Sequence, residues 1–260
     1  MPGRHSRNVS AVMVCLFSVM SFSRPLAAAE WSLAPSVNVE IGRDDNPTLT
    51  SGPSDTVSVV SFSPKIKMGR KTEISSVDLN VLLDATKYSG DEVPDTDTQI
   101  LSFSSLLRTT ERTEWGLNGE LRRDILFQTI YATPDTGDLQ DTDVALVSQK
   151  VRRNRRTARP SWRYALSERS SLGLSYGITD VSFSDAAGTG LVGYQNHQVS
   201  ATYSRRITRQ DDLSVTVSRF AYRPAENNTE SDSSQLLAGI SHAYSETARG
   251  RFLAGVRKTS

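Results

Sequence analysis

The stretch Ser76-Val77-Asp78-Leu79-Asn80-Val81-Leu82-Leu83-Asp84-Ala85 decides the fold class, because its side chains alternate in polarity. A β-strand points successive side chains to opposite faces, so strict alternation gives one apolar and one polar face. The odd-numbered positions of this stretch are all apolar, and the even-numbered positions are polar except for Leu82. The sequence therefore predicts a strand with one apolar face that is shielded from water and one polar face that is solvated.

The same alternation recurs along the chain after residue 30 and predicts eleven strands. Most of them have 9–12 residues. A tilted strand that crosses a bilayer needs about 9–11 residues, whereas strands of soluble proteins most often have about 5–6. The expected strands are 31–43, 57–68, 75–87, 99–108, 114–125, 145–165, 171–179, 195–205, 212–222, 234–244 and 251–257.

The connections between these strands alternate between short and long. The short ones are 69–74, 109–113, 166–170, 206–211 and 245–250, and the long ones are 44–56, 88–98, 126–144, 180–194 and 223–233. Tight turns at one end and longer loops at the other are typical of outer-membrane barrels. We therefore expect an all-β, antiparallel, up-and-down transmembrane β-barrel. The alternative is a soluble β-sandwich, in which the apolar faces would pack against each other.

The N-terminus has the pattern of a secretory signal peptide. Arg4 and Arg7 form a basic start, residues 11–22 are apolar, and three alanines at 27–29 offer a cleavage site. We expect a signal peptide at 1–29 and a barrel domain at 30–260. The only cysteine, Cys15, lies in the leader, so the mature chain contains no disulfide.

The charge balance and the few histidine and cysteine residues argue against several classes of function. Removal of residues 1–29 removes three arginines and no acid, which leaves 27 basic against 29 acidic side chains. This balance argues against a nucleic-acid-binding protein. The mature chain has two histidines, His197 and His242, and no cysteine. We therefore expect no metal site, no cofactor and no enzymatic activity; a Ser-His-Asp hydrolase that uses His197 is the weaker alternative.

Charged residues on the polar faces of the expected strands are candidates to line a lumen. The set mixes both signs, so facing charges can brace a narrow barrel, or they can form a constriction that selects polar solutes. These residues are Lys65, Lys67, Asp78, Asp84, Glu120, Arg122, Asp124, Arg159 and Arg163.

The densest cluster of charge lies at the start of the 145–165 strand. It consists of Arg152, Arg153, Arg155 and Arg156. Guanidinium groups suit phosphate oxygens, so one interpretation is contact with lipopolysaccharide phosphates. The other is a solvated basic strand end.

Aromatic residues fall largely toward strand ends on the apolar side, as expected for rings at the membrane interface. They are Trp31, Trp115, Trp162, Tyr88, Tyr164, Tyr176 and Tyr203.

A loop motif and a turn style carry a resemblance to a known group. The motifs are Gly42-Arg43-Asp44-Asp45-Asn46, Glu111-Arg112-Thr113-Glu114-Trp115 and Ser167-Glu168-Arg169-Ser170. Together they resemble proteobacterial outer-membrane β-barrels associated with exopolysaccharide export and exosortase systems. The resemblance implies an outer-membrane location in a Gram-negative cell. It also implies membrane lipid, lipopolysaccharide, the barrel assembly machinery and polysaccharide export components as partners.

The end of the chain departs from the pattern of that group. Bacterial single-chain barrels have an even number of strands, and we count eleven. The chain ends Arg257-Lys258-Thr259-Ser260, where barrels of this class usually end in an aromatic residue. We expect a truncated chain or a miscounted strand. The leading hypothesis is a porin-like channel or an accessory of polysaccharide export, and the alternative is a structural or adhesive barrel with a plugged lumen.

Overall fold

The structure is a computed structural model, and it describes residues 29–44, 56–89, 95–126, 150–187, 189–225, 230–245 and 247–260. The predicted signal peptide lies almost entirely outside these residues and stays a prediction. Among the described residues, no helix is both long and apolar enough to cross a membrane.

Eleven strands make up the described part of the chain, as predicted. They have 11–17 residues, so most are longer than expected. The predicted 145–165 strand begins at Val151, and residues 145–149 lie outside the described part. The strands are β1 (Glu30–Asp44), β2 (Val57–Lys71), β3 (Ser75–Tyr88), β4 (Thr96–Thr110), β5 (Thr113–Leu126), β6 (Val151–Ser167), β7 (Ser170–Ser184), β8 (Tyr194–Arg206), β9 (Asp211–Pro224), β10 (Ser231–Ala243) and β11 (Arg249–Thr259).

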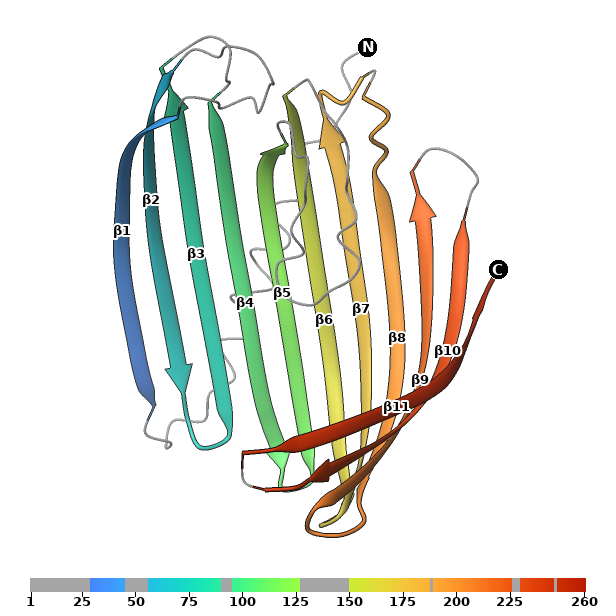
Figure 1. Ribbon diagram of the computed structural model, residues 1–260. Coiled ribbons are helices and arrows are strands. Elements are labelled where there is room, and N and C mark those ends of the chain that lie inside the picture. Colours follow the sequence, from blue (N-terminus) through green and yellow to red (C-terminus); the bar gives the residue numbers. More distant parts are fainter. Residues whose placement is uncertain are drawn as a thin grey trace.

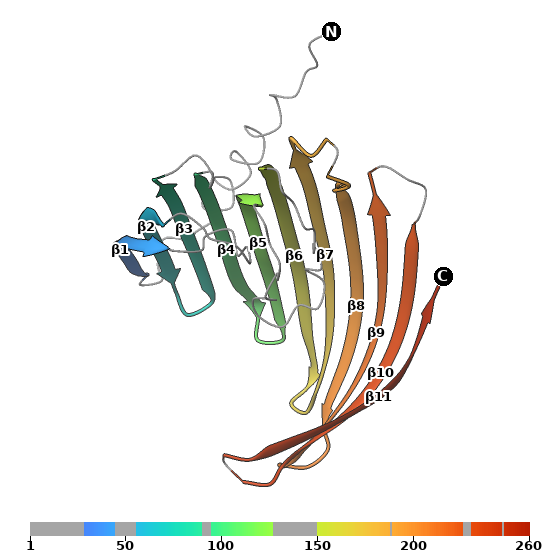
Figure 2. The same ribbon diagram turned by 45° about the horizontal axis from the view of Figure 1, so that its top comes forward.

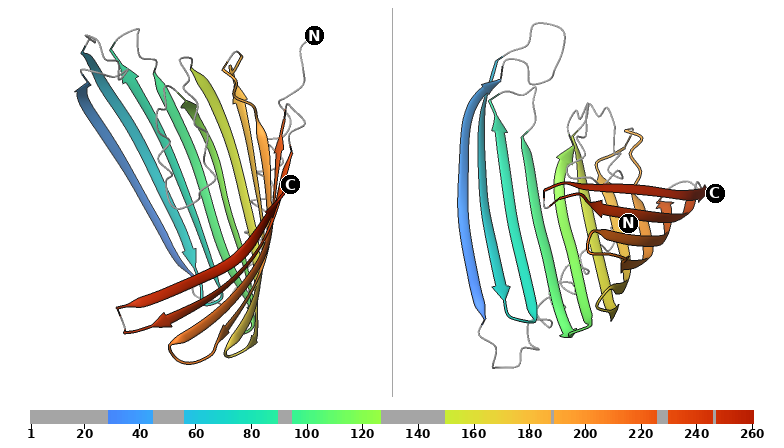
Figure 3. Two further views of the ribbon diagram at one scale, coloured as in Figure 1. Left: turned by 45° about the vertical axis from the view of Figure 1, so that its right-hand side comes forward. Right: turned by 60° about the horizontal axis from the view of Figure 1, so that its bottom comes forward.

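All eleven strands form one sheet in chain order, and every neighbouring pair is antiparallel. This confirms the predicted all-β, up-and-down meander (Figure 1). The strands β1 and β11 lie at opposite edges and do not pair in the described residues, so the sheet is open (Figure 2). The sheet is strongly curved, and the strands at the β11 edge run at a steep angle to those at the β1 edge (Figure 3).

The five short connections share one turn chemistry. In each, a Ser or Thr hydroxyl accepts a hydrogen bond from a backbone N–H two or three residues later, at 3.0–3.3 Å. Such side-chain turns replace backbone contacts where two strands reverse direction. The hydroxyl residues are Thr72, Thr110, Ser167, Thr208 and Ser245. All five turns lie at one end of the sheet, which we call the short-connection end; the opposite end is the long-connection end (Figure 1).

The register gives the sheet two chemically different faces. Directly opposed residues share a face, and along β2 to β4 the pairs Met68–Leu79 and Leu79–Phe103 join apolar side chains. The neighbouring positions pair Lys67 with Asn80. We call the first side the apolar face and the second the polar face. The same parity continues through all ten strand pairs, apart from a register shift beside the turn in the β4–β5 and β6–β7 pairs.

We expect neighbouring positions on β4 to respond differently to the same substitution. Leu101 lies on the apolar face between Val81 and Leu121, so Leu101→Arg should cost about 2–4 kcal/mol if this face meets hydrocarbon. Ser102→Arg, on the polar face beside Glu120, should cost less than about 1 kcal/mol. The measurement is the free energy of unfolding in urea with lipid vesicles present. Equal losses for the two variants would contradict the assignment of the faces.

Candidate functional site

The apolar face is exposed across the whole width of the sheet. Ile41 on β1 is 77% exposed, and Phe252 and Val256 on β11 are 68% and 70% exposed. Most of the other exposed large apolar side chains lie on this face. In water, so much uncovered apolar surface is unfavourable, because each Å² costs about 25 cal/mol. In a bilayer the same face is covered by lipid chains.

Aromatic side chains gather on this face at the short-connection end. Trp162 stacks on Tyr164 with ring centroids 5.8 Å apart, and it lies 6.3 Å from Trp115 on β5. Trp31, at the start of β1, carries the Arg70 guanidinium 5.6 Å from its ring centroid. Tyr203 on β8 and Tyr244 directly after β10 also lie near the short connections of their strands. This row is the aromatic girdle of a membrane interface.

Two of the aromatic residues do not fit the predicted girdle. The prediction for Tyr88 was wrong: it lies opposite Val59 on the polar face, because the alternation places it in register with Asp84 and not with Ala85. Tyr176 is on the apolar face but lies in the middle of β7. Long antiparallel strands, an exposed apolar face and an interfacial girdle together make this sheet the wall of an outer-membrane β-barrel.

All nine charged residues predicted to line a lumen lie on the polar face. They come from β2 (Lys65, Lys67), β3 (Asp78, Asp84), β5 (Glu120, Arg122, Asp124) and β6 (Arg159, Arg163). Several of them, among them Lys67, Asp78, Glu120, Arg122 and Arg159, line a hollow of about 760 Å³. The strands β2 to β6 therefore form a charged sector on the polar face.

A buried ion pair closes the charged sector at the long-connection end. Arg153 donates from Nε to Asp124 Oδ1 at 3.1 Å and from Nη2 to Oδ2 at 2.9 Å. Arg122 donates to the same Oδ2 at 3.0 Å. Asp124 is 5% and Arg153 6% exposed. The carboxylate accepts both arms of the Arg153 fork and one N–H of Arg122, and the Arg153 contact ties β5 to β6.

Apart from Arg206 and Asp212 at the short-connection end, the strands β7 to β9 form a neutral hydroxyl sector on the same polar face. Its Ser and Thr side chains bond across strands, with 2.7 Å between Ser175 Oγ and Ser200 Oγ and 3.0 Å between Thr202 Oγ1 and Thr216 Oγ1. The members are Ser171, Ser175, Thr179, Ser200, Thr202, Ser204, Ser214, Thr216 and Ser218. Hydroxyl groups both donate and accept, so this sector offers hydrogen bonds without charge.

The four arginines at the start of β6 do not form one surface. Arg153 and Arg155 lie on the polar face opposite Asp124 and Arg122, whereas Arg152 and Arg156 lie on the apolar face. The alternation that places Arg159 and Arg163 on the polar face also fixes this split, and it was available in the sequence. Lipid can therefore reach only Arg152 and Arg156 of the four.

Arg123 on β5 joins Arg152 and Arg156 on the apolar face. It lies opposite Asn154, which is between those two arginines on β6. Arg152 also contacts Asp97 across β5, with 3.3 Å between Nη2 and Oδ1. We call Arg123, Arg152 and Arg156 the outer arginine cluster; the sequence analysis missed Arg123.

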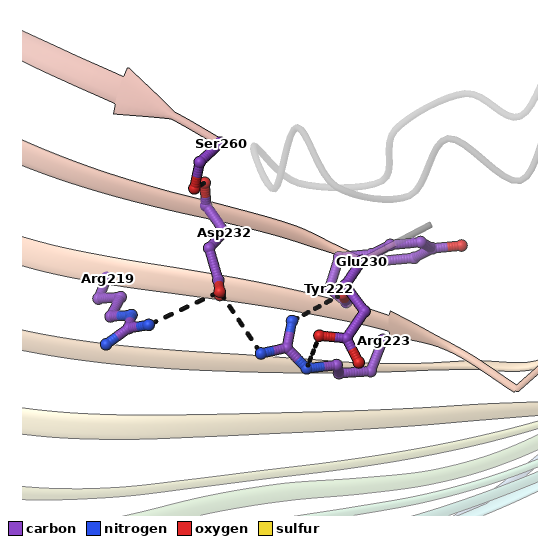
Figure 4. A network of polar contacts seen from close by, with 6 residues as sticks. All are labelled: Arg219, Tyr222, Arg223, Glu230, Asp232 and Ser260. Carbon is purple, nitrogen blue, oxygen red and sulfur yellow. Dashed lines mark hydrogen bonds and ion pairs between the residues drawn. The ribbon is translucent and has the colours of Figure 1, made fainter. Parts of the chain in front are cut away.

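A second group of outward charges lies near the long-connection end of β9 and β10. Asp232 Oδ2 is 3.6 Å from Arg219 Nη2 and 3.5 Å from Arg223 Nη2. Arg223 Nε is also 3.2 Å from Glu230 Oε2, and the backbone of Asp232 exchanges hydrogen bonds with Ser260 (Figure 4). The apolar face thus carries a group of aromatic rings near one end and a network of charges near the other.

The two histidines do not form a hydrolytic site with the described residues around them. Both belong to the apolar face: His197 Nδ1 is 2.7 Å from Tyr176 Oη, and His242 Nδ1 is 2.7 Å from Asp211 Oδ1. No described serine hydrogen-bonds either ring. The described side chains also contain no group of three or more His, Cys, Asp and Glu residues that could hold a metal ion.

Removal of the buried carboxylate should destabilise the sheet strongly. We expect Asp124→Asn to cost about 3–5 kcal/mol, because it removes the negative charge of a buried ion pair with Arg153. The matched control is Asp97→Asn, whose ion pair with Arg152 is about one-third exposed and should contribute less than about 1 kcal/mol. Urea unfolding in vesicles measures both, and a loss no larger than that of the control would contradict a buried pair.

Comparisons with known proteins give weak structural likenesses. No protein family model matches the sequence, and no curated protein matches it. The chain is similar to two solved structures of OmpT, an outer membrane protein of Vibrio cholerae. One is a loop L8 deletion mutant (8% identity, TM-score 0.48, 90% of this chain and 94% of that chain). The other is the trimer form (8%, TM-score 0.49, 90% and 89%). It is also similar to the toluene transporter TodX of Pseudomonas putida (10%, TM-score 0.37, 96% and 80%).

Proposed function

We propose that this protein is a porin-like channel of the outer membrane, whose polar face lines the path of the solute. The observation that carries the proposal is the division between the two faces. Charged and hydroxyl side chains cover one face, with a hollow of about 760 Å³, while the other face is fit for lipid. A water-filled lumen needs such a lining, because hydrophilic solutes then exchange bulk water for protein hydrogen bonds.

The finer proposal is that the channel serves export of a polysaccharide. The neutral hydroxyl sector supports this, because Ser and Thr side chains can donate to and accept from the hydroxyl groups of a sugar chain. The sequence resemblance to barrels of exopolysaccharide systems points the same way. A structural or adhesive barrel with a filled lumen is the competing function, and conductance distinguishes the two.

We expect the purified protein to give steady ion currents in planar bilayers, with a preference for anions. Lys and Arg outnumber Asp and Glu on the polar face of the described strands, so the lumen attracts anions. Arg159→Gln should shift the reversal potential in a KCl gradient toward that of a less anion-selective channel. Arg123→Gln removes the same charge from the apolar face and serves as the control.

Three outcomes would contradict the proposal. Absence of ion current would support the adhesive barrel. Selectivity for cations would contradict the polar face as the lumen. Equal shifts of the reversal potential for Arg159→Gln and Arg123→Gln would contradict the assignment of the two residues to opposite faces. Rising salt should reduce the selectivity, because exposed charges are screened within about 10 Å at 0.1 M.

We also propose that the outer arginine cluster binds phosphate groups of lipopolysaccharide. In outer-membrane barrels the long connections face outward, and the outer leaflet there carries anionic headgroups. Three guanidinium groups around Asn154 suit phosphate oxygens, which they contact with paired N–H donors.

Joint substitution of Arg123, Arg152 and Arg156 by Gln should weaken binding of lipopolysaccharide by about tenfold or more. Binding is measured on the detergent-solubilised chain by native mass spectrometry. The control replaces three polar-face cations, Lys65, Lys67 and Lys71, by Gln and should leave the affinity unchanged. Equal loss in both variants would indicate a general effect of charge and would contradict the cluster as the site.

A further inference from the structure

A second hollow, of about 500 Å³, lies on the polar face at the short-connection end. Six arginines and two acids line it, together with six serines. Four of these arginines belong to the polar face by register and define what we call the arginine basin. They are Arg163 on β6, Arg206 on β8, and Arg249 and Arg251 on β11.

The basin is built around one row of the sheet. Arg206, Asp212, Ser241 and Arg251 lie directly opposite one another on β8, β9, β10 and β11. Arg163 on β6 lines the same hollow as Arg251 on β11, because the sheet curves strongly between these strands (Figure 3). Curvature therefore brings residues of six strands, β6 to β11, to one concave surface.

The charge of the basin is poorly compensated. Among the described residues, Arg206 has an ion pair with Asp212, at 3.6 Å between Nε and Oδ1, whereas Arg163, Arg249 and Arg251 have none. Like charges that share a concave surface repel each other and raise the energy of the empty site. An anion that enters relieves this repulsion and gains charge-assisted hydrogen bonds.

We propose that the arginine basin binds the oxyanion groups, phosphate or carboxylate, of an acidic solute that enters from the short-connection end. The guanidinium forks would hold the oxygens in pairs, and Ser241, Ser204 and Ser214 supply hydroxyl donors in the same hollow. In outer-membrane barrels this end faces the periplasm, so the solute meets the basin before the hydroxyl sector. The direction of transport rests on the proposed function; the binding itself does not.

Isothermal titration calorimetry on the full chain in detergent micelles at low salt tests the basin. The probes are pyrophosphate, trigalacturonate as a carboxylate, and maltotriose as a neutral sugar. We expect at least one of the two anions to bind with measurable heat, and we expect none from maltotriose. The joint variant Arg163→Gln and Arg251→Gln should weaken the anion about tenfold or more. The control Arg43→Gln and Lys87→Gln makes the same charge change on the apolar face, outside the outer arginine cluster, and should leave the affinity unchanged.

The thermal stability of the same variants gives a second measurement. Removal of unpaired, mutually repelling arginines should leave the melting temperature of the basin variant unchanged or higher. Lack of binding by both anions in the unmodified chain would overturn the proposal, as would equal weakening in the control. Specific binding without ion current would refute the channel and keep the basin. Ion current without anion binding would refute the basin and keep the channel.

Discussion

The structure depends on one constraint: in hydrocarbon, backbone N–H and C=O groups have no water to bond with and must pair with a neighbouring strand. Ten antiparallel ladders along strands of 11–17 residues meet this constraint between the outer edges of β1 and β11, which have no neighbouring strand among the described residues. The turns at the short-connection end also satisfy backbone groups: in each of them one Ser or Thr hydroxyl accepts a hydrogen bond from a backbone N–H. Because the backbone hydrogen bonds are made within the sheet, the side chains of one face can suit hydrocarbon and those of the other face can suit water.

Those two solvents account for the distribution of charge. Buried charge is found on the polar face, where Asp124 lies between Arg153 and Arg122. A network of outward charges lies near the long-connection end, where Arg219 and Arg223 contact Asp232. The apolar face between the two ends carries few charges along most strands. The polar face also separates a charged sector from a hydroxyl sector, so a solute meets different chemistry on different sides.

The sequence predicts the strands and their faces well because period two is a local property. Every strand was predicted, and the nine lumen candidates share one face because each was assigned by its parity. The arginines of β6 were treated as a block, although the parity of Arg159 already assigned Arg153 to the polar face. The arginine basin could not be predicted, because Arg163 and Arg251 are far apart in the chain. Only the curvature of the sheet brings them to one hollow.

The uneven ends of the apolar face fix the depth at which the wall rests in its bilayer. Indole and phenol rings prefer the boundary layer of one leaflet, and guanidinium groups cannot leave the aqueous layer of the other, so vertical drift is opposed in both directions. Each residue of the wall then has a defined depth in the bilayer. Trp162 and Arg163 are consecutive, so the floor of the arginine basin is level with the ring layer, where hydrocarbon gives way to headgroups. An anion bound in the basin would thus lie at the level of the headgroups, where the dielectric constant of the surroundings begins to decrease.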